Sequence, residues 1–148
     1  MAEIAFYHLT VTALDSVLPR LLSRARAAGH RVVVRAASEA RVRDLDALLW
    51  RYDEASFLPH GSARDGNPAA QPIWLTDRDE NPNGASMLVL VDGVEAGDWQ
   101  GFARGADLFD GNDADAVAMA RERWRRARAA GHALSYWRQS ATGWERKA

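Results

Sequence analysis

Apolar residues with two different periods alternate along the first fifty residues, and this alternation restricts the folds that the chain can adopt. Residues 3–9 (EIAFYHL) and 31–36 (RVVVRA) are rich in apolar, aromatic or β-branched side chains, which is typical of strands. Each run precedes apolar residues at helical spacing, which predicts helices over about residues 15–28 and 38–50, the second with Ser38 as N-cap. This order predicts an α/β fold: a single Rossmann-like domain with a mostly parallel central sheet and helices on both faces.

The rest of the chain continues the pattern. Further strands are predicted at 72–76, at 86–93, between 99 and 109, and at 132–139. A long helix is predicted to start at Asn112 or Asp113 and to run to about Ala130. From about residue 140 the chain is polar, and we expect a tail there at the end of one domain that spans residues 1–148.

Several kinds of chemistry lack their sequence signatures. The chain has no cysteine, which excludes disulfides, thiolate metal sites and cysteine nucleophiles. The turn at residues 10–13 has no glycine, so the dinucleotide-binding pattern is missing. Gly61 and Gly66 have the spacing of a P-loop, but Asn67 and Pro68 replace the required lysine and hydroxyl residue. We therefore expect no cofactor and no metal.

The sequence also predicts where the protein resides. No apolar run approaches the roughly 18 residues that a membrane span needs. The first ten residues lack a basic stretch followed by a long apolar one, as a signal peptide would have. A cytoplasmic protein without membrane contact is expected.

Charge is unevenly distributed along the chain. From Arg121 to the end, eight basic residues stand against two acidic ones, a net charge of +6, whereas the first 120 residues carry 11 basic and 18 acidic residues, a net charge of −7. This polarity indicates an acidic partner for the basic end. The alternative is that the acidic body neutralises the basic end within the molecule.

The basic residues concentrate on the last predicted helix. One face of that helix carries, at helical spacing, Arg121, Trp124, Arg125 and Arg128. Arginines beside an indole can grip the carboxylates of a peptide while the indole packs against an apolar side chain. The same residues could hold nucleic-acid phosphates. Complementing the helix dipole, worth about 0.3–1 kcal/mol per cation, does not require five arginines in eight residues.

A second feature is a group of large apolar residues after the second predicted helix. LLWRY at 48–52 is followed by SFLPH at 56–60. Aromatic side chains gathered at a helix end form either a contact surface or a part of the core, and the sequence leaves both interpretations open.

Stretches along the whole chain resemble the chi subunit family of bacterial DNA polymerase III. In the family's order these are AFYHL near the start, LDALLWRYDEASFLPHG at 45–61, NGASMLVLVDG at 83–93, DLFDG at 107–111, ARERWRRARAAGHALSYW at 120–137 and the closing TGWERKA. The combination of LLW…SFLPHG with ARERW…AAGH is the most specific part of this resemblance.

The resemblance implies a non-catalytic accessory subunit of the polymerase, acting as a monomer or as a heterodimer with the psi subunit. Members of the family join psi, which connects them to the clamp loader. They also bind the acidic, Phe-terminated C-terminal tail of single-stranded-DNA-binding protein, so their contact with nucleic acid is mainly indirect. The alternative function is direct binding of single-stranded nucleic acid through the basic C-terminal helix.

The resemblance also assigns residues to the two partners. The tail-binding site corresponds to Val117, Arg121, Trp124, Arg125 and Arg128, and the psi interface corresponds to Trp50, Phe57, Leu58 and Pro59. Trp124 stands where the family also uses tyrosine, and Arg125 replaces a lysine. Val117 stands where some members carry a further lysine, a loss of charge that Arg128 can offset.

Overall fold

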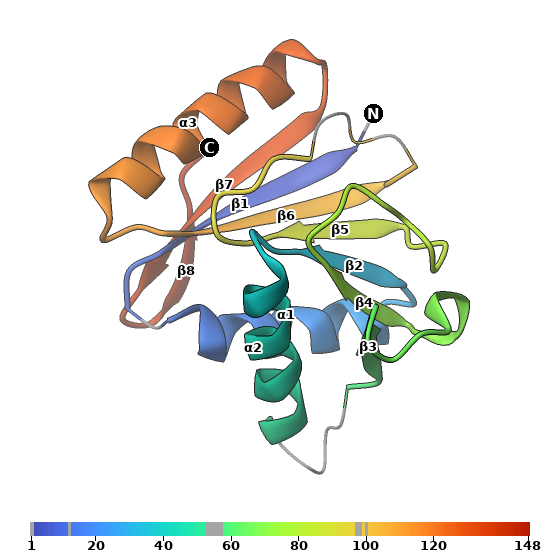
Figure 1. Cartoon of the computed structure of the whole chain (residues 1–148). Helices are drawn as coiled ribbons and strands as arrows, with labels where there is room; N and C mark the ends of the chain where they lie inside the picture. Colours follow the sequence, from blue (N-terminus) through green and yellow to red (C-terminus); the bar gives the residue numbers. More distant parts are fainter. Residues whose placement is uncertain (1, 12, 53–57, 97–98, 100) are drawn as a thin grey trace.

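The computed structural model describes all residues except 1, 12, 53–57, 97–98 and 100 (Figure 1). Within this part of the chain the strands are β1 (Glu3–Leu9), β2 (Val32–Arg35), β3 (His60–Ser62), β4 (Ile73–Thr76), β5 (Met87–Leu90), β6 (Arg104–Asp110), β7 (Ala133–Ser140) and β8 (Gly143–Arg146). The helices are α1 (Leu14–Ala27), α2 (Glu39–Arg51) and α3 (Ala114–Ala129), with a short 3-10 helix, η2 (Pro68–Ala70).

The strands form one sheet in the order β3-β4-β2-β5-β6-β1-β7-β8. The pairs from β3 to β7 are parallel, and β8 returns antiparallel to β7. Helices α1 and α2 cover one face of the sheet and α3 covers the other (Figure 1). The prediction of an α/β fold with a mostly parallel sheet and helices on both faces is confirmed.

Each face of the sheet has its own core. Side chains from α1 and α2, such as Leu18 and Leu45, pack with Val32 and Val34 of β2 on the first face. On the opposite face, Ala120 and Ala127 of α3 pack with Ile4 and Phe6 of β1. Since successive strand residues point to opposite faces, residues two apart serve the same core.

The three predicted helices are confirmed, and the predicted caps Ser38 and Asp113 begin α2 and α3, whereas α1 begins at Leu14 without a side-chain cap. The Ser38 hydroxyl accepts a hydrogen bond from the backbone N–H of Arg41 at 3.1 Å. The Asp113 carboxylate accepts from the N–H groups of Asp115 and Ala116. Both contacts satisfy helix donors that otherwise lack a partner.

Two strands were not predicted. β3 lies in a segment for which the sequence predicts no strand, because its three residues, HGS, show no apolar alternation. β8 lies in the segment that we described as a polar tail: it carries one large apolar residue, Trp144, and its pairing with β7 defines it. Pairing with a neighbouring strand, rather than local propensity, accounts for both.

Candidate functional site

Helix α3 is held on the sheet by small residues and one buried ion pair. Ala120 and Ala127 are buried against the sheet, which lets the helix approach closely. Arg123 donates two hydrogen bonds, of 2.6 and 3.0 Å, to the carboxylate of Asp107 on β6. Burial raises the pKa of the Asp107 carboxyl above its ordinary value, and the hydrogen bonds from Arg123 oppose that shift. This pair sets how α3 is rotated on the sheet.

The rotation leaves Trp124 partly exposed at the edge of the core. Its indole meets Phe6 edge-on, with 5.3 Å between ring centroids, and Tyr136 of β7, with 5.8 Å between centroids. Val117, two turns earlier, is also partly buried in this cluster. The indole is therefore fixed on one side and accessible on the other.

The predicted tail-binding residues lie together, and we call them the α3 surface: Val117, Arg121, Trp124, Arg125 and Arg128. Its three arginines are exposed. Arg125 forms an ion pair with Glu122 on the same helix, in which both side chains are more than half exposed. Arg121 and Arg128 form no ion pair with any residue that the structure describes.

Neutralisation by the acidic body is therefore partial. Two arginines of α3 form ion pairs with acidic residues of the first 120: Arg123 with Asp107, and Arg126 with Glu95. Neither arginine belongs to the α3 surface. Exposed pairs such as Arg125 with Glu122 are worth about 0–1 kcal/mol and exchange readily with another carboxylate.

The sheet adds groups to the α3 surface that the sequence did not predict. Nδ1 of His8 lies 2.6 Å from the hydroxyl of Tyr136. Burial, followed by the charge of Arg138, lowers the pKa of His8, and Arg121 contributes to the same shift. Burial raises the pKa of Tyr136, opposed by Arg121 and then Arg138. Arg138 of β7 therefore lies near the same point as Arg121 of α3.

A signal for these groups exists in the sequence. Leu134, Tyr136 and Arg138 alternate along β7, so a period of two places them on one face. Knowing which face required the pairing of β7 with β1, which no local pattern supplies.

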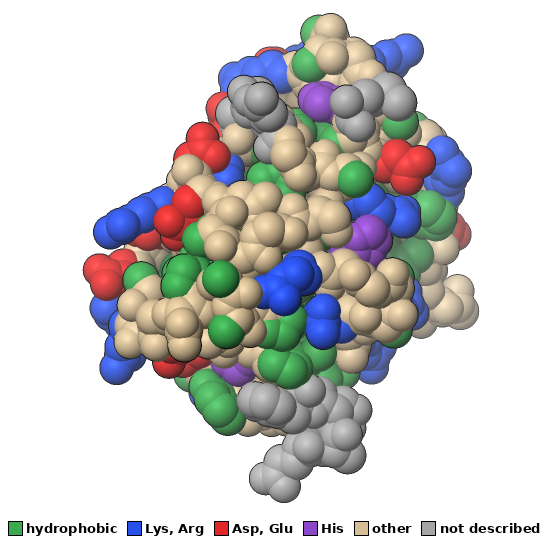
Figure 2. All heavy atoms as spheres, turned by 90° about the vertical axis from the view of Figure 1, so that its right-hand side faces the viewer, with side chains coloured by type: hydrophobic (Ala, Val, Ile, Leu, Met, Phe, Trp, Pro, Cys, Tyr) green, Lys and Arg blue, Asp and Glu red, His purple; other side chains and the backbone are tan. Residues whose placement is uncertain are grey.

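The second predicted interface, the α2 surface, comprises Trp50, Phe57, Leu58 and Pro59. Trp50 is 59% exposed, whereas Leu58 is 4% exposed and belongs to the core. Pro59 is exposed, and Phe57 lies outside the described residues. Leu58 therefore lies in the core beneath the α2 surface and does not form part of its exposed area. Figure 2 shows hydrophobic side chains at the lower end of its view, the level at which α2 ends in Figure 1.

A buried histidine orients Trp50. The His60 ring lies edge-on to the indole, with 5.2 Å between ring centroids. Nδ1 of His60 is 2.7 Å from the carbonyl oxygen of Leu58, and Nε2 is 3.0 Å from a carboxylate oxygen of Asp46. Because both ring nitrogens have partners, His60 gives the exposed indole a fixed support.

The α3 and α2 surfaces lie at different ends of the molecule (Figure 1). Among the residues that the structure describes, no group of three or more histidine and acidic side chains is arranged to hold a metal ion. None of the helices in the described ranges has the length and apolar character needed to cross a membrane.

Comparison with known proteins identifies similar chains. The family model described as "DNA polymerase III chi subunit, HolC" matches residues 1–135. A "Probable DNA polymerase III subunit chi" of Rickettsia prowazekii is 33% identical over 91 residues, which is 62% of this chain and 55%, little more than half, of that protein. A "DNA polymerase III subunit chi" of Haemophilus influenzae is 28% identical over 142 residues, which is 91% of this chain and 96% of that protein.

Proposed function

The chain belongs to the family of DNA polymerase III chi subunits, and from this premise we propose that it is a non-catalytic adaptor in bacterial DNA replication. It bridges the psi subunit, bound at the α2 surface, to the acidic C-terminal tail of single-stranded-DNA-binding protein, bound at the α3 surface. The polymerase assembly is thereby linked to the coated template strand.

One observation carries the tail-binding half of this proposal: Arg121 and Arg128 flank the half-buried Trp124, and both are exposed and pair with no acidic side chain among the described residues. Carboxylates of the tail bind Arg121 and Arg125, with Arg128 supplying charge one turn later. The terminal phenyl ring packs beside the indole, whose other contacts are already fixed by Phe6. Guanidinium groups suit this role because they donate two parallel hydrogen bonds to a carboxylate.

The strand residues extend the site. Arg138 lies on the same side as Arg121, so an acidic tail longer than its terminal carboxylate meets further positive charge. Because most of these cations are exposed, the interaction is modest in strength and weakens with salt. An adaptor that releases and rebinds its partner during replication requires such an interaction.

The psi-binding half is supported by Trp50. An indole with 59% of its surface exposed, held by a buried histidine, is unusual in a free monomer but typical of an interface anchor. Pro59 adds a rigid apolar neighbour.

The tail proposal is tested with a labelled acidic peptide ending in Pro-Phe, whose binding to the full chain is followed by fluorescence anisotropy. We expect Arg121→Glu to weaken binding about tenfold or more, the loss of one charged hydrogen-bonded contact. Trp124→Ala also weakens it. Arg43→Glu, on the exposed face of α2, makes the same change in net charge and leaves binding within about twofold of wild type.

Two results would contradict the tail proposal. The first is equal binding by wild type and Arg121→Glu. The second is a preference for a single-stranded oligonucleotide over the peptide that is lost in Arg121→Glu, which would support the alternative of direct nucleic-acid binding by α3.

The psi proposal is tested by titrating purified psi with wild type and with Trp50→Ala. Removing an interface tryptophan weakens binding by about 30-fold or more. Wild-type affinity for psi in Trp50→Ala would show that this surface is not the interface.

A further inference from the structure

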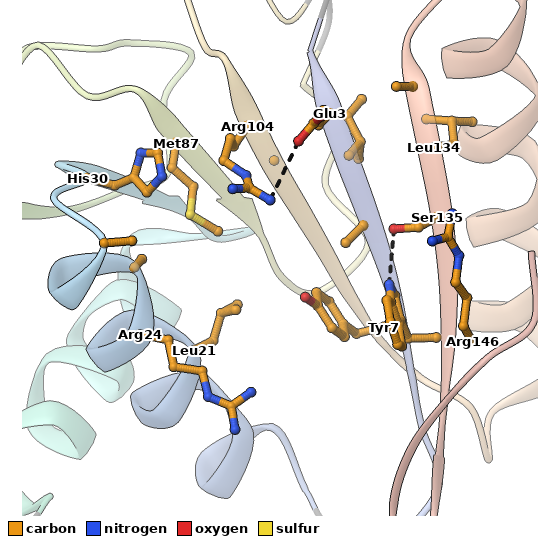
Figure 3. A pocket seen from close by; sticks show the side chains of 17 residues that line it. Glu3, Tyr7, Leu21, Arg24, His30, Met87, Arg104, Leu134, Ser135 and Arg146 are labelled. Atoms are coloured by element: carbon orange, nitrogen blue, oxygen red, sulfur yellow. Dashed lines mark hydrogen bonds and ion pairs between the residues drawn. The ribbon is translucent and has the colours of Figure 1, made fainter.

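The face of the sheet opposite α3 carries a groove that neither proposed partner occupies. It runs between α1 and the strands β1, β7 and β8. Two adjoining hollows, of about 480 and 720 Å³, form it and share the side chains of Tyr7, Leu21, Arg24 and Trp137. Figure 3 shows the first hollow, with Leu21 and Arg24 reaching in from α1 and Tyr7 and Arg146 lying across from them. We call this feature the α1 groove.

The floor of the α1 groove is aromatic. Tyr7 of β1 and Trp137 of β7 are register partners on adjacent strands. The ring of Trp144 on β8 meets Tyr7 edge-on, with 5.3 Å between centroids. All three rings are partly exposed, and Trp137 is held by a hydrogen bond from its Nε1 to the Ser135 hydroxyl at 3.0 Å. Three neighbouring strands thus present three rings to one surface.

The walls of the α1 groove are basic. Its charged lining consists of one acidic residue, Glu3, and four arginines: Arg20, Arg24, Arg104 and Arg146. Glu3 lies 3.5 Å from Arg104, and the Arg146 guanidinium lies 5.9 Å from the centroid of the Trp137 ring. Within the described part of the chain, Arg20 and Arg24 have no acidic partner. This excess of positive charge lies partly in the segment that is acidic as a whole, with a net charge of −7 over the first 120 residues.

We propose that the α1 groove binds single-stranded nucleic acid directly, with bases stacked on Tyr7, Trp137 and Trp144 and phosphates on the arginines. Aromatic rings along a basic groove are the elements by which proteins hold single strands without reading their sequence. Arg20 and Arg24 are four residues apart on α1, so their Cβ atoms lie about 5–6 Å apart and their guanidiniums reach neighbouring phosphates. The strand β1 and the residues after it, 3–11, give the groove a length of about 26 Å at about 3.3 Å per residue, room for several nucleotides.

Along β1 and β7 the backbone argues against a peptide in extended conformation. β1 pairs with β6 and β7, and β7 pairs with β1 and β8, so neither strand has a free edge to which a peptide could add. Among the strands of the floor in the described part of the chain, β8 alone lies at the edge of the sheet. Because the groove and the α3 surface lie on opposite faces of the sheet, a strand of nucleic acid and a protein tail can bind at the same time.

The test measures binding of a fluorescein-labelled oligothymidylate of about 15 nucleotides, long enough to fill one groove, to the full chain by anisotropy over a range of salt concentrations. In the double variant Arg20→Gln/Arg24→Gln we expect weaker binding at low salt. The negative slope of log K against log salt concentration should become less steep by about 1.4, because each phosphate contact on a single strand contributes about −0.7 to that slope and two contacts are lost. The matched control, Arg43→Gln/Arg64→Gln, removes two exposed arginines elsewhere and should leave the slope unchanged.

A second pair of variants tests stacking. Trp144→Ala should weaken binding about fivefold or more, the effect of losing one stacked base, whereas Trp144→Phe retains a ring and most of the affinity. Circular dichroism and thermal unfolding check that each variant is folded, and the arginine variants, which are exposed, provide the test if Trp144→Ala is not.

Three outcomes would overturn the proposal. The first is that wild type does not bind the oligonucleotide at low salt. The second is that the groove variants and the control variant lose the same amount of oligonucleotide affinity. The third is that Arg121→Gln/Arg128→Gln loses oligonucleotide binding while the groove variants keep it. An acidic peptide that binds wild type but not Arg20→Gln/Arg24→Gln, with oligonucleotide binding unchanged, would identify the groove as a peptide site instead.

Discussion

The buried pair between Arg123 and Asp107 makes a strong prediction about stability. The side chains of Arg123 and Asp107 are 7% and 2% exposed, and both carboxylate oxygens accept hydrogen bonds from the guanidinium, at 2.6 and 3.0 Å. Arg123→Met keeps an unbranched side chain but leaves the carboxylate buried without its partner. We expect a loss of about 3–5 kcal/mol in the free energy of unfolding, the usual effect of removing one member of a buried pair. For a chain of this size the melting temperature should fall by about 6–20 °C.

The assay is urea denaturation of wild type, Arg123→Met, Asp107→Leu and the double variant. The double variant should recover most of the loss, because an apolar pair of similar size needs no compensating charge. Arg126→Met is the matched control: Arg126 and its partner Glu95 are 61% and 56% exposed, so their pair should contribute about 0–1 kcal/mol. Two results would refute the reasoning. One is a decrease of less than about 1 kcal/mol in the free energy of unfolding of Arg123→Met. The other is a decrease in the double variant that equals the sum of the decreases in the two single variants.

The same variant has a predictable dependence on pH. Burial already raises the pKa of Asp107, and Arg123 is the group that lowers it. Without Arg123, the folded state binds a proton more tightly than the unfolded chain does. A group with a raised pKa stabilises the fold at low pH and loses this effect as the pH rises. The destabilisation of Arg123→Met should therefore be largest near neutral pH and smaller in acid.

Two further predictions concern the strand side of the α3 surface. Burial first, and then the charge of Arg138, lowers the pKa of His8 below its ordinary value of 6.5, so the unfolded chain takes up the proton more readily and the free energy of unfolding should fall as the pH drops below about 6.5. In His8→Gln the free energy of unfolding should depend less on pH. If the urea midpoints of wild type and His8→Gln shift equally between pH 7.5 and 5.5, the prediction is contradicted. In Gly111→Ala the new Cβ would collide with the His8 ring and come within 2.7 Å of the Leu9 carbonyl oxygen. We therefore expect the free energy of unfolding to fall by about 1–3 kcal/mol. An unchanged melting temperature would contradict this and show that the His8 ring is free to move aside.

The elements that the sequence predicts well are those whose pattern is local. The helices have a period of 3.6, and α2 and α3 also have side-chain caps, Ser38 and Asp113. The central strands are continuous apolar runs, such as the β-branched residues of β2. β3 and β8 have neither signal. They form because a neighbouring strand offers backbone groups to pair with, and this information is not contained in four residues.

The candidate sites divide in the same way. The α3 surface could be predicted because its arginines and Trp124 lie within three turns of one helix. The contribution of His8, Tyr136 and Arg138 could not, because it depends on which strands are neighbours. The α1 groove was missed for the same reason: its three rings come from residues 7, 137 and 144, and the third lies on a strand that was not predicted. Leu58 shows the reverse case, in which a residue assigned to an interface by resemblance lies in the core.

Successive side chains of β7 point to opposite faces of the sheet, so this one strand contributes to both the α3 surface and the α1 groove. Tyr136 faces the basic helix and Trp137 faces the groove behind it. Inserting or deleting one residue in this strand would exchange their orientations and take both rings away from their neighbours at once. Changes in chain length should therefore be tolerated in the short turn between β7 and β8, residues 141–142, and not within the strand itself.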